Sequence, residues 1–176
     1  MKKLLILIAL SSALFAEAKV YVGAGVGFLH EKLDNSKAKT YNHGKLKVGY
    51  GDINAYAVEF SFDYTQKDNK ETIYNATDSY GVNVELLKAF DFNTFFNPYL
   101  KAGFGFGYYK SNDKKETSMH YGNFIFGTGV FIPFLEYYDL QLGYEYKTIS
   151  YEKAEEEKNN ISSNAHIGYI GINVRF

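Results

Sequence analysis

Hydrophobic side chains recur at every second position through most of this chain, which is the period of a β-strand with two unlike faces. The clearest stretch places Tyr56, Val58, Phe60, Phe62 and Tyr64 on one face, with Ala57, Glu59, Ser61 and Asp63 on the other. The same alternation recurs in segments 20–29, 45–50, 79–86, 100–108, 123–132, 140–147 and 169–176. The pattern therefore predicts an all-β chain of about eight strands.

The side chains on the two faces indicate which face points outward. One face carries large aliphatic and aromatic residues, such as Phe60, Phe104 and Phe124, and the other carries glycine with Lys, Glu, Asp, Asn and Tyr. A soluble barrel would show the same alternation, but the narrow interior of eight strands cannot hold so many phenylalanines. In water, an outward band of aromatics would promote aggregation. We therefore predict an antiparallel, up-and-down transmembrane β-barrel with its apolar face toward lipid.

The connections between the expected strands alternate in character. Residues 51–54, Gly-Asp-Ile-Asn, form a predicted tight turn. Segments 32–44, 65–72, 110–117 and 152–163 are long and charged, and we expect them to face the cell exterior. Aromatic residues gather near both strand ends, as membrane-interface girdles do in such barrels.

The first residues predict export from the cytoplasm. Lys2 and Lys3 precede the apolar run 4–10, and Ala16-Glu17-Ala18 provides a cleavage site, so residues 1–18 read as a secretory signal peptide. This run is far shorter than the roughly 20 residues that a membrane-spanning helix requires. We therefore expect a cleaved segment 1–18 and a barrel domain 19–176. The absence of cysteine rules out a lipid-attachment cysteine, disulfides and thiolate metal sites.

Charge and motifs exclude several classes of function. Without the signal, 19 basic and 20 acidic residues become 17 and 19, a net charge of −2, which argues against nucleic acid as a partner. Glycines at 23, 25 and 27, and again at 103, 105 and 107, superficially match phosphate-binding loops. Those loops require a following helix, which the pattern does not predict, so we expect small inward residues and no cofactor.

The C-terminal segment carries the most specific family feature, with alternating Ile170, Ile172 and Val174 followed by the terminal Phe176. From Lys19 to Phe176, the sequence resembles the small outer-membrane β-barrel superfamily of the OmpA transmembrane domain, OmpX and the opacity proteins. The resemblance implies a place in the bacterial outer membrane among its lipids and lipopolysaccharide. It also implies that the insertion machinery recognises the C-terminal segment. Because the chain stops at its last predicted strand, we expect no tethering to the cell wall.

Charged residues on the inward face are the candidate functional residues. The basic ones are Lys45, Lys47, Lys101, Lys147 and Arg175, and the acidic ones are Glu59, Asp63, Glu85 and Glu145. Lys47 and Glu59 lie equally far from residue 53, the centre of the turn from Asp52 to Asn54, so we expect them to be direct cross-strand neighbours. The set forms either an ion-paired plug or a gated ion path. The plug is the preferred interpretation, because an interior of this size is normally filled.

The remaining candidate residues, for hydrolysis, metal binding or ligand binding, give weaker indications of function. Ser162, Ser163, Asn164 and His166 could contribute to a hydrolytic set, but their order differs from the His-x-Ser-Asn of the lipid A deacylase family, and no acidic partner is evident. His30, His43 and His120 are expected to be isolated surface residues, with no metal site. The charged loops read as a solvated rim that could also bind an extracellular ligand. We therefore expect a non-enzymatic structural or surface-interaction protein, with a narrow channel or a lipid A-modifying enzyme as alternatives.

Overall fold

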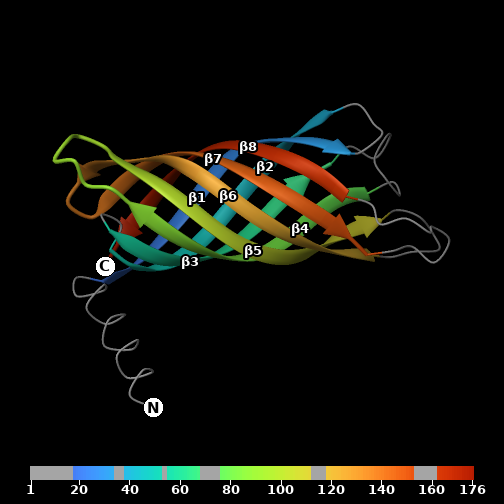
Figure 1. Cartoon of the computed structure of the whole chain (residues 1–176), viewed down its shortest axis with the longest axis horizontal. Coiled ribbons are helices and arrows are strands. Elements are labelled where there is room, and N and C mark those ends of the chain that lie inside the picture. The colour runs from blue at the N-terminus through green and yellow to red at the C-terminus, as the bar shows by residue number, and fades with distance from the viewer. Residues whose placement is uncertain (1–17, 34–37, 53–54, 68–75, 112–117, 153–161) are drawn as a thin grey trace, which may run out of the picture.

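The computed structural model describes residues 18–33, 38–52, 55–67, 76–111, 118–152 and 162–176. Within these ranges, the chain forms a closed barrel of eight antiparallel strands in sequential order (Figure 1). The strands are β1 (Lys19–Leu33), β2 (Lys39–Gly51), β3 (Tyr56–Gln66), β4 (Ala76–Ala89), β5 (Asn97–Ser111), β6 (Ser118–Leu135), β7 (Tyr138–Tyr151) and β8 (Ser162–Arg175). The predicted fold class is confirmed.

Closure of the barrel gives every strand two partners. β8 pairs with β1 over a continuous register from Tyr21 opposite Arg175 to Leu33 opposite Ser163, so the sheet has no free edge. No helix within the described ranges is long and apolar enough to pass through a bilayer. The predicted signal segment, except for Ala18, lies outside the described residues, and its removal stays a prediction.

The two faces of the strands are separated as predicted. In β3, the burial of side chains alternates at every position: Glu59 is fully buried, whereas 58% of the neighbouring Phe60 is exposed. Even-numbered residues of this kind cover the outside of the barrel. Tyr64, Tyr80 and Tyr108 form a row of outward rings, with neighbouring centroids 5.3 and 5.2 Å apart. The apolar face is therefore the exterior of the barrel.

Several strands are longer than the apolar alternation predicts. β1 continues to Leu33 and β2 begins at Lys39, although both segments were expected to lie in a loop. Here the inward positions are polar, and Glu31 and His43 are both buried. The ladder of backbone hydrogen bonds requires only a paired strand, so it continues after the apolar side chains end. The prediction of a loop is therefore wrong at residues 32–33 and 39–44.

The register of β2 against β3 also differs from the prediction. Lys47 lies opposite Ser61, and Glu59 lies opposite Gly49, so Lys47 and Glu59 are diagonal rather than direct neighbours. The N–H of Asp52 donates to the carbonyl of Tyr56 at 2.8 Å, and Gly51 lies opposite Ala57. The pairing of β2 with β3 is therefore centred on position 54 instead of position 53. A one-residue shift of the centre moves each pairing by two positions and keeps both side chains inside.

The two ends of the barrel are built differently. The short connections β2–β3, β4–β5 and β6–β7 lie at the same end as the start of β1 and the end of β8 (Figure 1). We call this the turn end. The strand ends that the other four connections join lie at the opposite end, which we call the loop end. In outer-membrane barrels, short turns face the periplasm and long loops face the exterior.

Candidate functional site: the filled barrel interior

Three layers of side chains fill the interior. At the turn end lies an aromatic floor, made of Tyr21, Ala57, Leu87, Ala89, Tyr99 and Phe131. Next comes a charged centre, made of Lys45, Lys47, Lys101, Lys147, Glu59, Asp63, Glu85 and Glu145. Toward the loop end lies an upper layer, made of Leu29, Tyr109, Tyr121, Ile149, Tyr151, Ala165, Ile167 and Tyr169. The odd-numbered positions of all eight strands contribute to this core.

Inward glycines make room for the long side chains of the charged centre. A Cβ atom at Gly127 would lie 3.0 Å from Cε of Lys101, and one at Gly23 would lie 2.7 Å from Cε of Lys47. Both distances are below ordinary van der Waals contact. The glycine-rich face that the sequence shows therefore has a packing role, because a larger residue there would displace a lysine.

Two lysines and two glutamates form the middle of the charged centre. The ammonium of Lys101 lies 2.5 Å from Oε2 of Glu85 and 2.6 Å from Oε1 of Glu145. Lys45 reaches the same two carboxylates, at 3.1 and 2.6 Å. These four residues come from β2, β4, β5 and β7, so their ion pairs join opposite walls of the barrel.

A second group of contacts connects the charged centre to the floor. Nζ of Lys47 lies 2.7 Å from Oε1 of Glu59 and 2.6 Å from Oε1 of Gln141. The hydroxyl of Tyr21 donates to the same carboxylate of Glu59, at 2.8 Å. The diagonal register of β2 and β3 therefore still allows the predicted Lys47–Glu59 contact.

Asp63 organises the side of the charged centre nearer the loop end. Lys147 donates directly to Oδ2 of Asp63, and Nδ2 of Asn83 donates to the same oxygen at 2.9 Å. With this pair, the centre holds four cations and four carboxylates and is electrically balanced. Balance matters because an uncompensated charge in such a buried place costs several kcal/mol.

Arg175 does not join the charged centre. Its Nε lies 3.0 Å from Oδ2 of Asp139, at the turn end, and its side chain is partly exposed. The inward position of Arg175 follows from its odd number, but β8 ends there, so the guanidinium lies far from the carboxylates named in the sequence analysis. Asp139, its partner, was not among the predicted site residues.

A cluster at the loop end was also missed. Glu31 accepts hydrogen bonds from Tyr151 (2.5 Å) and Ser163 (2.7 Å) and pairs with Lys67, whose Nζ lies 2.5 Å away. Lys67 also lies 4.2 Å from the ring centroid of Tyr109. We call this cluster the loop-end lock. Continued odd-number alternation past Leu29 was the signal that could have placed Glu31 inside.

Gln141 is a further residue that the sequence reasoning left out. Its Nε2 donates to the hydroxyls of Tyr99 and Tyr169, at 2.8 and 3.1 Å, while Oε1 accepts from Lys47. The two tyrosine hydroxyls are themselves 2.8 Å apart. This amide therefore joins the aromatic floor, the charged centre and the upper layer.

The space left among the described inward residues near the loop-end lock is small. A cavity of about 20 Å³ lies between the charged centre and the loop-end lock, with His43, Asp63, Lys147 and Tyr121 among its lining residues. This volume holds about one water molecule. At the described strands, the interior is a packed core with room for single waters rather than a wide pore.

The candidate hydrolytic residues do not converge. Ser163 points into the loop-end lock, whereas His166 is exposed on the outside of β8, where its Nδ1 lies 2.5 Å from the hydroxyl of Tyr144. Asn164 is also outside, and it accepts a hydrogen bond from Tyr146 at 2.8 Å. Ser163 and His166 lie on opposite faces of β8, so they cannot form a nucleophile and base pair. Ser162 shares the outward face of His166 but lies four residues along the strand, about 13 Å away, which is beyond hydrogen-bond reach.

The histidines do not gather into one cluster: His30 lies opposite His166 in the β1–β8 register, whereas His43 and His120 belong to β2 and β6. His30 and His120 are exposed, as predicted. His43 is buried, with its Nδ1 3.0 Å from Oγ1 of Thr65, so its assignment to the surface is wrong. Among the described residues, no cluster of three or more His, Cys, Asp or Glu side chains could hold a metal ion.

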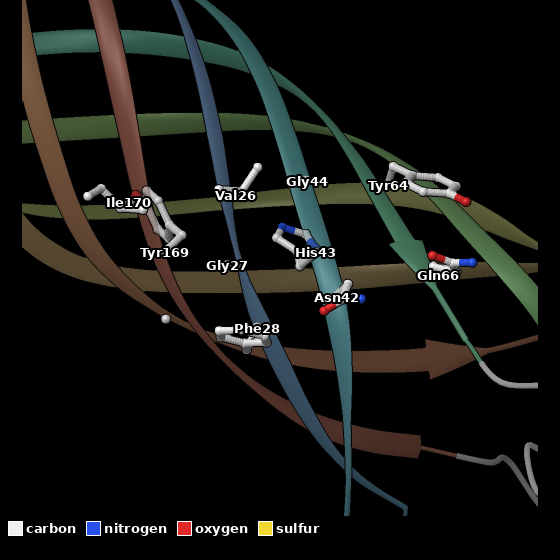
Figure 2. Close-up of a pocket in the computed structure, with 11 residues that line it drawn as sticks. Val26, Gly27, Phe28, Asn42, His43, Gly44, Tyr64, Gln66, Tyr169 and Ile170 are labelled. Carbon is white, nitrogen blue, oxygen red and sulfur yellow. The ribbon is translucent and has the colours of Figure 1, made fainter.

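The exterior carries a shallow depression over two glycines. Figure 2 shows Val26, Tyr64 and Ile170 around Gly44, and Gly168 also lines this space of about 530 Å³. A Cβ atom at either glycine would meet nothing within 4 Å. The depression lies on the outward apolar face and holds no charged group, so the filled interior remains the candidate site.

The predicted C-terminal assembly segment lies on the same exterior. Ile170, Ile172 and Phe176 are exposed, and Val174 is half-buried. The backbone N–H of Phe176 donates to the carbonyl of Val20 at 2.9 Å, which holds the last residue against β1. The apolar side chains of the segment therefore remain accessible from outside the barrel.

Solved structures of small outer-membrane barrels share this fold. Neisserial surface protein A (NspA) has 16% identity and a TM-score of 0.73, covering 90% of this chain and 99% of that one. Ail, the attachment invasion locus protein of Yersinia pestis, has 20% identity and a TM-score of 0.57 over 90% and 99%. OprG of Pseudomonas aeruginosa has 13% identity and a TM-score of 0.52 over 90% and 96%. A search of curated proteins found no significant match.

The similarity to solved structures shows the fold of the chain, and a match to a family model shows the family to which it belongs. The model of the outer membrane protein beta-barrel domain matches residues 4–176, nearly the whole chain. The outward apolar face and the closed eight-stranded sheet agree with this match. The chain therefore belongs to the outer membrane protein beta-barrel family and is located in the bacterial outer membrane.

Proposed function

We propose that this barrel is a closed, non-enzymatic scaffold that acts at the cell surface through its loop end. The balanced charged centre is the observation that carries the proposal. Its cations and carboxylates contact one another across the barrel, with the shortest separations about Lys101 at 2.5 and 2.6 Å. Such contacts make a rigid core and leave no charged group facing an open path.

The energetics of the centre favour a closed resting state. To open a path for an ion, Lys45 and Lys101 would have to leave Glu85 and Glu145 while all four remain out of bulk water. Breaking a buried ion pair costs about 3–5 kcal/mol when one partner is left unpaired. The aromatic floor would then still fill the turn end, with Tyr99 and Phe131 stacked at 4.6 Å between ring centroids.

Conductance in planar bilayers tests this proposal against the narrow channel. We expect the purified, folded barrel to produce no reproducible current steps, while a general porin inserted into the same bilayer does so. Reproducible openings that depend on the folded barrel would refute the closed scaffold. Heat-modifiable migration on gels verifies that the barrel added to the bilayer is folded.

We infer three kinds of partner for a scaffold of this type. Lipids and lipopolysaccharide contact the exterior belt, and the insertion machinery recognises Ile170, Ile172, Val174 and Phe176. The third partner is an extracellular ligand at the loop end. Ail has been solved in complex with the heparin analogue sucrose octasulfate. A sulfated glycan is therefore the first ligand class that we propose for this chain.

Binding to immobilised heparin tests the ligand class. Lys32 and Lys110 are exposed near the loop-end limits of β1 and β5. We expect the barrel in neutral detergent to be retained at low salt, and the variant Lys32→Ala/Lys110→Ala to elute earlier. The variant Lys19→Ala, at the turn end, serves as the matched control and should elute like the wild type. Absence of retention at low salt would reject this ligand class.

A further inference from the structure

Two histidine side chains lie next to each other on the outside of the barrel, where the first and last strands meet. His30 of β1 lies directly opposite His166 of β8, and both side chains are exposed. Directly opposite residues of an antiparallel pair have Cβ atoms about 4.5–5.5 Å apart. Local alternation does not reveal this neighbour, because the two strands lie at opposite ends of the sequence. We call His30 and His166 the histidine pair.

A hydroxyl group contacts one ring nitrogen of each member of the pair. Nδ1 of His30 lies 2.9 Å from Oγ1 of Thr40, and Nδ1 of His166 lies 2.5 Å from the hydroxyl of Tyr144. When Nδ1 carries the proton, it donates to the hydroxyl oxygen, and Nε2 keeps its lone pair. Histidines that bind metal ions usually have this arrangement, in which an oxygen partner of the second nitrogen fixes the tautomer and the ring orientation. Both rings can therefore offer Nε2 as a ligand.

The histidine pair lies on the loop-end side of the apolar belt. On its turn-end side, the next outward residues are Phe28 of β1, opposite Gly168 of β8, and they are followed by the exposed Ile170. On its loop-end side, the next outward residues are Lys32 and Asn164, which lie opposite each other. The pair therefore marks the level at which the lipid-facing surface becomes polar, so a hydrated ion can reach it from the cell exterior.

Two neighbouring imidazoles favour a particular class of metal ion. The bond from zinc to an imidazole nitrogen is about 2.0–2.1 Å long, so two nitrogens on one tetrahedral ion are about 3.3 Å apart. Since the two Cβ atoms are only slightly further apart than this, a modest tilt of the rings brings both Nε2 atoms to one ion. Imidazole suits Zn²⁺, Cu²⁺ and Ni²⁺, whereas Mg²⁺ and Ca²⁺ prefer oxygen ligands. Water molecules complete the coordination.

We propose that His30 and His166 form an external binding site for one divalent transition-metal ion, of which Zn²⁺ is the representative. Each histidine supplies Nε2, while Thr40 and Tyr144 hold the rings. The bound ion joins β1 to β8 near the loop end, at the seam that closes the barrel. Because the unfolded chain does not hold the two histidines together, the ion binds the folded barrel more tightly and stabilises it. This inference goes beyond the proposed scaffold and does not depend on whether the interior conducts ions.

Calorimetric titration with Zn²⁺ tests the site, using the folded barrel in neutral detergent and without a histidine tag. His30→Asn and His166→Asn each remove one ligand and keep a polar side chain. His120→Asn is the matched control, because it removes an exposed histidine on β6 that does not belong to the pair. Heat-modifiable migration verifies that each variant is folded before the titration.

The proposal predicts one Zn²⁺ per barrel in the wild type and a higher midpoint of urea unfolding when Zn²⁺ is present. His30→Asn and His166→Asn weaken binding by about tenfold or more, since even the loss of a hydrogen bond to a ligand has an effect of that size. Both variants also lose the shift of the midpoint, whereas His120→Asn behaves like the wild type. Excess Mg²⁺ does not displace Zn²⁺.

Three results would overturn the proposal. The first is a wild type that does not bind Zn²⁺ at concentrations up to the millimolar range. The second is binding of undiminished affinity in His30→Asn or His166→Asn, which would place the ion on the charged loops. The third is an equal loss of binding in His120→Asn. Because the readouts are metal affinity and unfolding, they remain separate from the conductance that tests the closed scaffold.

Discussion

Removing the ammonium of Lys101 is the sharpest test of the charged centre. The side chain is fully buried, and its Nζ lies 2.5 Å from Glu85, 2.6 Å from Glu145 and 3.7 Å from Glu59. With an effective dielectric constant of about 20, each of the two short pairs has a Coulomb attraction of about 6 kcal/mol. The cost of withdrawing the ions from water offsets much of this attraction, so the cost of breaking such a pair is about 3–5 kcal/mol.

We therefore expect Lys101→Met to lower the free energy of unfolding by about 3–5 kcal/mol, because it leaves three cations facing four carboxylates. Methionine has a similar length, so the loss reports charge more than volume. Unfolding in urea, followed by gel mobility and circular dichroism in detergent micelles, measures the change from the shift of the midpoint.

Two further variants separate charge balance from packing. Lys101→Met combined with Glu85→Gln returns the centre to three cations and three carboxylates, and it should recover much of the lost stability. Lys32→Met, on the exposed face, should change the free energy by less than about 0.5 kcal/mol. If Lys101→Met unfolded at the urea concentration of the wild type, or if the double variant were no more stable than the single one, the reasoning would be wrong.

Three other results follow from the structure. Gly103→Ala should destabilise the barrel by about 1–3 kcal/mol, because the new Cβ would lie 2.8 Å from Cα of Glu85. Gly168→Ala is the control and should leave the stability unchanged, because nothing lies within 4 Å of its Cβ position. Equal midpoints of urea unfolding for the two variants would contradict this expectation. Phe176→Ala should reduce the fraction of heat-modifiable barrel in cells, and an unchanged fraction would reject the proposed assembly role. Lipid A from cells with the wild type, with His166→Ala and without the protein should have the same mass, since His166 and Ser163 lie on opposite faces.

The arrangement of the charged centre also limits how the barrel could evolve toward transport. A pore would need smaller residues at the aromatic floor and separated charges above it. Tyr21, Tyr99 and Phe131 are all almost fully buried, and Gln141 ties Tyr99 to the layers above. Because the layers share hydrogen bonds, opening one of them would leave polar groups in the next without partners.

The sequence by itself determined which face each strand residue occupies and how many strands there are. Alternation with a period of two is a property of the extended backbone, so the parity of a residue decides its side wherever a strand forms. Glu59 is inside and Phe60 is outside for this reason. The size of the outward residues then indicated lipid as the surrounding medium. Where polar residues continued the alternation, as at His43 and Thr65, hydrophobicity no longer marked the strand, and both were assigned to loops.

Only the tertiary structure decided which charges meet. Lys45 and Glu145 are 100 residues apart, and Glu31 and Ser163 are 132 apart, so their contacts depend on closure of the sheet and on the register of every turn. The one-residue shift in the centre of the β2–β3 turn left each residue on its face but changed which residue lies opposite Lys47. Local periodicity specifies a face, whereas a contact across the barrel requires the position of all eight strands.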